Sequence, residues 1–141
     1  MITISPISNC PCGSGASYAT CCKPFHDGLP AGNALQLMRS RYSAYALNLI
    51  DYIIKTTHPK NPQYSEDLLH WAKEIEEFSL QTGFKKLTIL EFKDGASTAT
   101  VTFVVDLVQN EQHRTYTEKS TFEKIEGRWL YLNGVMIDGN N

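Results

Sequence analysis

The hydrophobic pattern of the chain changes after Phe78, where a helical period gives way to an alternating one. The helices that the first part predicts cover residues 33–49, 51–57 and 65–78. Asn33 and Ser65 are suitable N-caps, and Pro59 and Pro62 end the second helix. The side chains expected to face inward are Leu35, Met38, Tyr42, Tyr45, Ala46, Leu49, Tyr52, Ile53, Ile54, Leu68, Leu69, Trp71, Ala72 and Ile75.

The second part of the chain is typical of strands, because apolar residues occupy every second position. The strands that we expect cover residues 86–92, 98–108, 113–125 and 128–137. Lys93-Asp94-Gly95 and Glu126-Gly127 are turn sequences between them. Three helices followed by a four-stranded antiparallel meander predict an α+β domain, with the helices packed on one face of a curved sheet.

Composition limits the class of protein. A length of 141 residues allows one domain with an appendage, and no apolar run approaches the length needed to cross a membrane. The formal net charge of −2 argues against a general nucleic-acid binder, which would need a basic surface. The opening residues, Met1–Pro6, contain neither a basic region nor a long apolar run, so we expect a cytoplasmic protein without a signal peptide.

All four cysteines lie between Cys10 and Cys22, as a C-x-C pair, eight residues and an adjacent Cys-Cys pair. Four sulfurs so close together can surround one ion, and Zn²⁺ is the natural occupant of a tetrahedral thiolate site. Disulfides are a weaker interpretation, because pairing adjacent cysteines would close small, strained rings. A catalytic cysteine would need one thiolate and a nearby base rather than four crowded thiols.

The ligand set of this predicted zinc knuckle is Cys10, Cys12, Cys21 and a fourth residue, which is Cys22 or, less favourably, His26. Gly13-Ser14-Gly15 allows a sharp turn between the pairs. Residues 1–28 therefore form the expected knuckle and residues 29–141 the α+β domain, with a Gly/Pro linker over 27–32. We expect loss of zinc to leave the domain after this linker folded.

The cysteine segment resembles the SEC-C motif, the zinc-binding tail of SecA preprotein translocases. The residues that match its pattern are Cys10, Cys12, Gly13, Ser14, Gly15, Cys21 and Cys22. In SecA the motif binds the chaperone SecB and the ribosome, so the resemblance implies a protein or ribosomal partner by analogy.

A wider resemblance covers nearly the whole chain. The segments Leu37–Tyr45, Thr57-His58-Pro59 and Gly127–Gly134 are similar to the YchJ family, bacterial proteins of unestablished function with an N-terminal SEC-C motif. This resemblance implies a nuclear transport factor 2-like cone, in which helices pack against a bent sheet and leave a central pocket. Such cones include dehydratases, isomerases and binding modules, so the fold alone does not decide whether the chain is an enzyme.

The residues expected to face a central pocket are Tyr42, Tyr45, His58, Trp71, Tyr116, Glu118 and Trp129. His58 with Glu118 or Asp51 could perform general acid–base chemistry, although packing or capping is the more common role for such a histidine. Arg39 and Arg41 could clamp an anion, or Arg41 could make a surface ion pair.

Two functions of different classes therefore remain open. In the first, which we favour, the chain is a non-enzymatic adaptor that uses the zinc knuckle to bind a protein, with the cone as a scaffold that could form a homodimer through its sheet. In the second, the cone is a small-molecule or lyase/isomerase-like site and the knuckle is accessory. A pocket with His58 beside a buried carboxylate would favour the enzyme, and a cone plugged by aromatic side chains would favour the adaptor.

Overall fold

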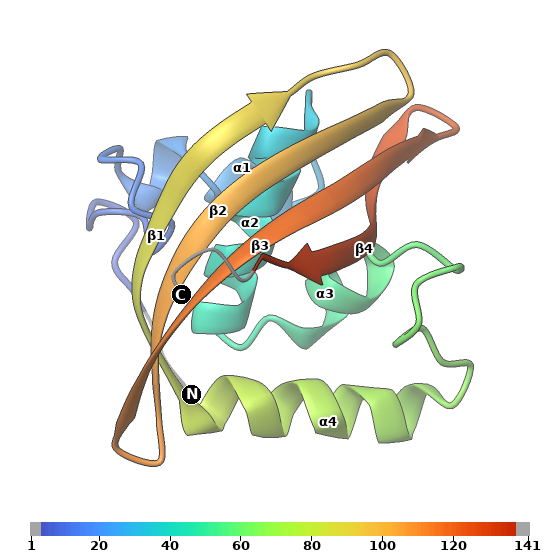
Figure 1. The fold of residues 1–141 in the computed structure, drawn as a ribbon. Coiled ribbons are helices and arrows are strands. Elements are labelled where there is room, and N and C mark those ends of the chain that lie inside the picture. The colour runs from blue at the N-terminus through green and yellow to red at the C-terminus, as the bar shows by residue number, and fades with distance from the viewer. Residues whose placement is uncertain (1–3, 138–141) are drawn as a thin grey trace.

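A four-stranded antiparallel sheet curves around one central helix in the computed structural model, which describes residues 4–137 (Figure 1). The strands lie in the order of the chain and are β1 (Thr82–Lys93), β2 (Thr98–Gln109), β3 (Gln112–Ile125) and β4 (Arg128–Met136). The helices are the 3₁₀ turn η1 (Tyr18–Thr20), α1 (Lys23–His26), α2 (Ala34–Ala46), α3 (Ile50–Lys55) and α4 (Leu68–Gln81). The predicted α+β class, with helices against a curved antiparallel meander, is confirmed.

Tight turns join the last three strands. Asn110 and Glu111 between β2 and β3, and Glu126 and Gly127 between β3 and β4, all have positive φ. Two consecutive residues of positive φ form the type I′ turn that suits the twist of a hairpin. Irregularities in the pairing of β1 with β2 and of β3 with β4 add bending, because a bulge increases the local twist of a strand.

The helices form where they are expected, but α4 runs to Gln81 rather than Phe78, and β1 begins at Thr82 rather than at residue 86. Asn33 caps α2, since its Oδ1 accepts a hydrogen bond from the amide of Gln36 at 2.8 Å. The expected cap of the third helix, Ser65, is wrong, because Asp67 caps α4 instead. The buried stripe of α4 then begins at Trp71, and Leu68 and Leu69, both expected to face inward, are exposed.

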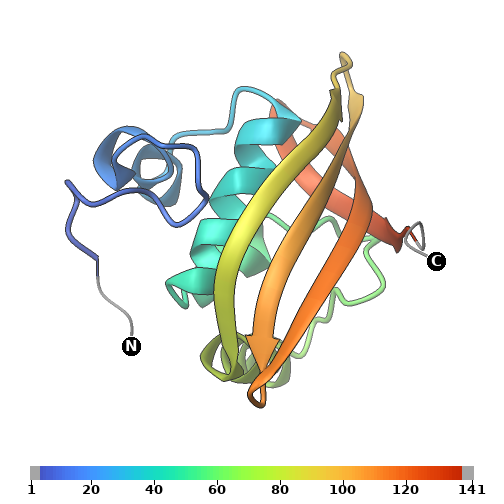
Figure 2. The ribbon, with the colours of Figure 1, turned by 60° about the vertical axis from the view of Figure 1, so that its left-hand side comes forward.

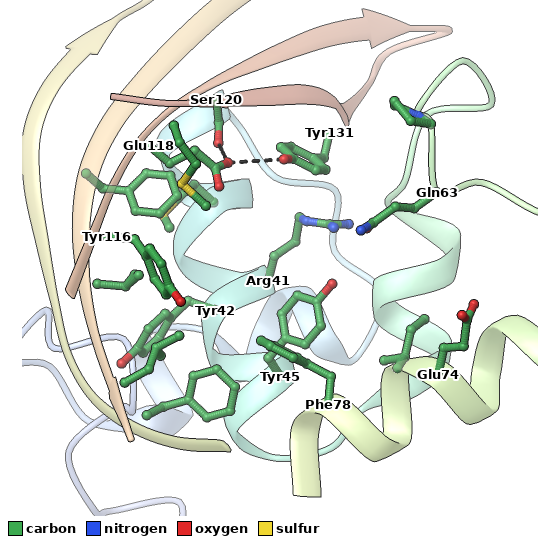
Figure 3. Close-up of a pocket in the computed structure, with 18 of the residues that line it drawn as sticks. Arg41, Tyr42, Tyr45, Gln63, Glu74, Phe78, Tyr116, Glu118, Ser120 and Tyr131 are labelled. Atoms are coloured by element: carbon green, nitrogen blue, oxygen red, sulfur yellow. Dashed lines mark hydrogen bonds between the residues drawn. The ribbon is translucent and has the colours of Figure 1, made fainter. Parts of the chain in front are cut away.

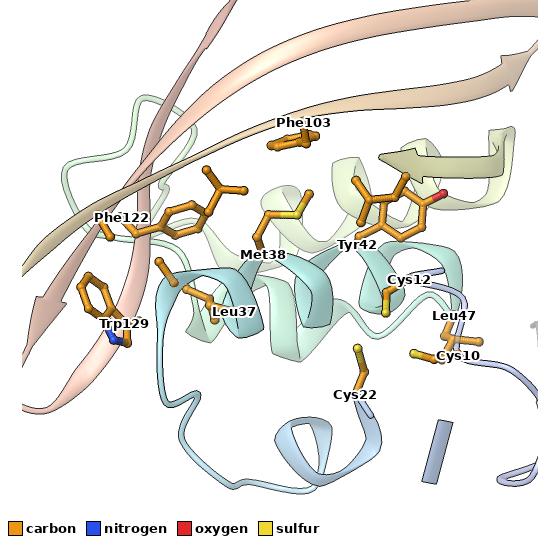
Figure 4. Packing of buried hydrophobic residues seen from close by; sticks show 14 of the residues in the cluster. Cys10, Cys12, Cys22, Leu37, Met38, Tyr42, Leu47, Phe103, Phe122 and Trp129 are labelled. Carbon is orange, nitrogen blue, oxygen red and sulfur yellow. The ribbon is translucent and has the colours of Figure 1, made fainter. Parts of the chain in front are cut away.

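The knuckle and the domain share one hydrophobic core. Figure 2 shows the segment before α2 packed beside this helix, so that α2 lies between the knuckle and the sheet. The buried cluster that surrounds α2 contains Cys10, Cys12 and Cys22 as well as Leu37 of α2 and Phe122 of β3 (Figure 4). The Gly/Pro linker therefore does not keep the two parts out of contact, and independent folding of the domain stays a prediction.

The segment that follows α3 forms backbone hydrogen bonds with β4, which is an edge strand of the sheet. The amide of His58 donates to the carbonyl of Tyr131, and the amide of Tyr131 donates to the carbonyl of Thr56, each at 2.9 Å. These two bonds form a parallel bridge between Thr57 and Tyr131, whose side chain lines the cavity described below. Among residues 4–137, no helix combines the length and the apolar character that crossing a membrane requires.

Candidate functional site

Four sulfur atoms meet where the knuckle packs on α2. The Sγ atoms of Cys10, Cys12, Cys21 and Cys22 all lie within 4.8 Å of one another. The Cys12–Cys21 and Cys21–Cys22 separations are 3.5 and 3.9 Å. A tetrahedral ion with metal–sulfur bonds of about 2.3 Å places its sulfurs about 3.8 Å apart. The spacing and the all-sulfur donor set therefore fit one metal ion.

The local backbone explains how the cysteines converge. The amide of Cys10 donates to the carbonyl of Ala16 at 2.9 Å, which folds the first pair into a small loop. Gly13 and Gly15 turn this loop with φ of 78° and 93°, a region that glycine enters without steric strain. The second pair lies between η1 and α1, so its sulfurs face back towards the first.

Side chains of α2 support the sulfurs from the domain side. The hydroxyl of Ser43 lies 3.3 Å from Sγ of Cys10 and 3.4 Å from Sγ of Cys22. Nη1 of Arg39 donates to the carbonyl of Cys12 at 3.0 Å and lies 3.8 Å from its Sγ. A hydroxyl and a guanidinium at these positions stabilise thiolates and orient them for a cation.

The pKa values of three of the four thiols depend on one another. Hydrogen bonds from Cys10 and Cys22 hold the pKa of Cys12 well below its usual range. Hydrogen bonds with Cys10 and Cys12, together with burial, raise the pKa of Cys22 far above the usual range of a thiol. Burial raises the pKa of Cys21 to about 11. One thiolate thus suppresses its neighbours, and a divalent cation would allow the others to ionise.

His26 does not compete for the fourth ligand position. Its Nε2 lies 2.8 Å from the carbonyl oxygen of Ser40, and its Nδ1 lies 2.7 Å from the hydroxyl of Tyr18. A carbonyl can only accept, so Nε2 donates and Nδ1 accepts from the tyrosine. Both ring nitrogens are therefore used, and Cys22 rather than His26 completes the cluster.

A second feature, a cavity of about 840 Å³, lies between α2, α4 and the concave face of the sheet (Figure 3). Pockets for small organic molecules have volumes in this range and similar aromatic walls. The aromatic residues that line it are Tyr42, Tyr45, Tyr64, Trp71, Phe78, Phe84, Phe103, Tyr116, Phe122 and Tyr131. Its charged residues are Arg41, Glu74 and Glu118.

A polar cluster stands at one end of this cavity. Oε2 of Glu118 accepts hydrogen bonds from the hydroxyls of Ser120, at 2.5 Å, and Tyr131, at 3.1 Å. Burial and the nearby Glu118 carboxylate raise the pKa of Tyr131 above its usual range, so its hydroxyl remains a donor. Gly134 makes room for the cluster, because a Cβ there would collide with Glu118 and with the hydroxyl of Tyr131.

Five of the seven expected pocket residues line the cavity: Tyr42, Tyr45, Trp71, Tyr116 and Glu118. His58 and Trp129 lie outside its lining, which corrects the expectation for both. Trp129 is buried in the core around α2, because β4 turns its ring towards Leu37 and Phe122 (Figure 4).

The expected pairing of His58 with Glu118 or Asp51 does not form. Nε2 of His58 instead lies 2.7 Å from Oε1 of Glu123, and its Nδ1 accepts from the amide of Lys60 at 3.0 Å. These bonds tie the loop after α3 to the sheet. His58 therefore has the packing role that such a histidine more commonly plays.

The two arginines of α2 have separate environments. Arg39 donates a hydrogen bond to the carbonyl of Cys12 in the knuckle, whereas Arg41 is buried and lines the cavity. The guanidinium carbon of Arg41 lies 4.7 Å from the centre of the Tyr131 ring, a cation–π contact. Arg41 consequently makes no surface ion pair.

Sequence reasoning missed Tyr131, Ser120, Gln63 and Gly134 as contributors to the cavity. An alternation signal was present for Ser120, which shares the inward face of β3 with Tyr116 and Glu118. Gln63 lies in the loop before α4, where no periodic pattern indicates which side chains turn inward.

Comparison with known proteins identifies the family. A family model described as "YchJ, middle NTF2-like domain" matches residues 33–134. A UPF0225 protein of Actinobacillus succinogenes is 39% identical over 132 residues, which cover 90% of this chain and 81% of the relative. The chain belongs to the YchJ family.

Two solved structures extend the YchJ likeness to the knuckle. A SEC-C motif containing protein from Rhodopseudomonas palustris has a TM-score of 0.79 and 33% identity, covering 92% of this chain and 99% of that one. A sec-c motif containing protein from Psychrobacter arcticus has a TM-score of 0.76 and 26% identity, covering 96% and 86%. The expected YchJ membership and cone are confirmed, and the cysteine cluster fits the SEC-C knuckle.

Proposed function

We propose that this YchJ-family chain binds a small organic molecule in the cone pocket, and that Zn²⁺ on the four cysteines holds in place the helix that lines it. The observation that carries the proposal is the cavity of about 840 Å³, with aromatic walls and a few converging polar groups. This combination is typical of small-molecule sites. A protein that served only as a scaffold could have its cone filled by aromatic side chains. Here the aromatic side chains line the cavity and leave it open.

The zinc part of the proposal rests on the chemistry of the donors. Four cysteine sulfurs at tetrahedral spacing suit Zn²⁺, and the buried, supported geometry leaves no open ligand position. We expect elemental analysis of the purified chain to find about one zinc per chain. The variant Cys22→Ser should lose it. A preparation with iron and visible absorbance, or without any metal, would contradict this assignment.

The pocket is tested by a neutral fluorescent probe. N-phenyl-1-naphthylamine gains fluorescence in apolar surroundings, and we expect saturable binding to the zinc-loaded protein. Gln63 is exposed and lines the cavity, so Gln63→Trp should narrow the pocket and weaken binding without disturbing the core. Gln112→Trp, at the exposed start of β3, is the matched control. Equal binding by both variants would show that the probe does not occupy the cone.

Protein recruitment by the knuckle is a second candidate function. Ile7 and Leu29 are large apolar side chains with exposed fractions of 86% and 58%, and both lie on or directly after the knuckle. A chaperone or ribosomal partner is the analogy that the SEC-C motif offers. The test compares proteins captured from a lysate by the wild type and by the double variant Ile7→Ser, Leu29→Ser. Unchanged capture would remove the knuckle surface as the contact.

A further inference from the structure

Arg41 is a buried cation without a carboxylate partner. Its exposed fraction is 7%, and no acidic side chain of residues 4–137 comes within salt-bridge distance of it. Arginine is rarely this buried unless an anion compensates its charge. The cone therefore contains a positive charge that its own acidic residues do not pair directly.

The contacts of Arg41 hold its guanidinium in one orientation. Nη1 donates to the carbonyl of Ile53 at 3.1 Å and to the hydroxyls of Thr56 and Thr57 at 2.7 and 3.1 Å. These acceptors are neutral, so they fix the group without neutralising it. The ring of Tyr131 supports the guanidinium from one face.

The remaining donors of Arg41 open onto the cavity. Within residues 4–137, Nη2 and Nε of Arg41 make no hydrogen bond. Neither atom is fully buried, so both remain accessible to a ligand. Figure 3 shows Arg41 extending into the pocket towards Gln63, with the hydroxyl of Tyr45 pointing to the same space. Two adjacent N–H groups in a fixed plane match the geometry of a carboxylate.

An acceptor lies at the other end of Tyr131. Oε2 of Glu118 takes the hydroxyls of Ser120 and Tyr131, while Oε1 has no partner within the described residues. Glu74 also lines the cavity, but its side chain is 63% exposed and lies 3.7 Å from His70, so water screens its charge. The pocket thus offers a rigid pair of donors at Arg41 and a carboxylate acceptor at Glu118.

We infer that the ligand of this pocket is an organic carboxylate with an aromatic or apolar body and a hydroxyl or amino group at its far end. Its carboxylate pairs with Nη2 and Nε of Arg41, and its far donor binds Glu118. The body lies against aromatic residues such as Tyr45, Phe78 and Tyr116. This inference rests on the proposed role of the cone as a small-molecule site.

The ligand side of the test uses the unaltered, zinc-loaded protein. We would measure displacement of N-phenyl-1-naphthylamine by 2-naphthoate, 2-naphthamide and 6-hydroxy-2-naphthoate. A charge-assisted pair with Arg41 should make the naphthoate bind about tenfold more tightly than the amide. The hydroxyl should add a further gain of severalfold through Glu118.

The protein side of the test removes each charge in turn. Arg41→Gln should abolish the preference for naphthoate over naphthamide, and Glu118→Met should abolish the gain from the hydroxyl. Arg114→Gln, which removes an exposed arginine of β3, should change neither. If Arg41→Gln does not fold, the comparison of acid and amide on the wild type still decides the question.

The outcomes separate this inference from the proposed function. If the neutral probe binds and naphthoate is no better than naphthamide, the inference fails while the pocket stands. Preference for an amine, such as 2-naphthylmethylamine, would also overturn it and assign the pocket to cations at Glu118. If no compound binds, the proposed function itself fails.

Discussion

Gly134 is a residue whose missing side chain shapes the pocket. It pairs with Ser120 across β3 and β4, beneath the carboxylate of Glu118. A methyl group at this position would overlap Oε2 of Glu118 and press on the hydroxyl of Tyr131. The polar end of the cavity therefore depends on a residue that contributes no polar group.

The substitution Gly134→Ala should displace Glu118 and break its bond to Tyr131. Because the colliding atoms are the movable ends of the Glu118 and Tyr131 side chains, which can shift aside, we expect a loss of only about 1 kcal/mol in the free energy of unfolding. The affinity gain from the hydroxyl of 6-hydroxy-2-naphthoate should disappear as well. Thermal melting and probe displacement measure the two effects.

Gly83→Ala provides a matched control for this prediction, because Gly83 also lies in a strand. A Cβ there would meet its nearest atoms at 3.5–3.7 Å, which is ordinary contact. Its stability and its ligand preference should stay close to those of the wild type. Equal behaviour of the two variants would show that the pocket tolerates a methyl group at Gly134.

At the scale of elements, α2 joins the two functional features. Arg39, Ser40 and Ser43 contact the knuckle from one side of the helix. Met38, Arg41, Tyr42 and Tyr45 line the cavity from the other. Both sites therefore contact the same helix, which is buried along most of its length, so a change at one site can shift the residues of the other.

Removal of the metal should consequently weaken ligand binding in the cone. Without a cation, the Cys12 thiolate disfavours ionisation of Cys22, so we expect the knuckle to hold α2 less firmly. We expect a chelator to lower the affinity for 2-naphthoate severalfold, and added Zn²⁺ to restore it. Titration of the chelated and reloaded protein measures the change, and identical affinities would mean that α2 does not couple the sites.

Elements could be predicted from sequence wherever the signal is local. The alternation of β3 and the Glu126-Gly127 turn identified the hairpin, and the close spacing of the cysteines identified their cluster. The partner of His58 could not be predicted, because Glu123 is 65 residues away and its proximity depends on how β4 packs. The start of α4 also escaped prediction, since Ser65 and Asp67 are both good caps.

The largest difference from the sequence prediction concerns the whole molecule. The Gly/Pro composition of residues 27–32 predicted a linker between the knuckle and the domain. A linker sequence does not reveal whether the two parts it joins pack against each other. The docking depends on side chains far apart in the chain, such as Ser43 with Cys10 and Arg39 with Cys12. As a result, three cysteines belong to the main hydrophobic core.

A shared core predicts a single cooperative unfolding transition that depends on the metal. Chelation should lower the Tm of the entire chain, because a ligand that binds only the folded state stabilises all that unfolds with it. For a chain of this length, each kcal/mol corresponds to roughly 3–5 °C, so a zinc contribution of several kcal/mol gives a shift on the order of 10 °C or more.

The two tryptophans allow the cooperativity to be measured in separate parts of the cone. Trp129 lies in the cluster that contains the cysteines, and Trp71 lies in the second cluster with Ile53 and Ile75. The variants Trp71→Phe and Trp129→Phe each leave one fluorescent reporter. If both reporters shift together on chelation, the knuckle is part of one folding unit; if neither moves while zinc is lost, the knuckle is only an attachment to an independently stable cone.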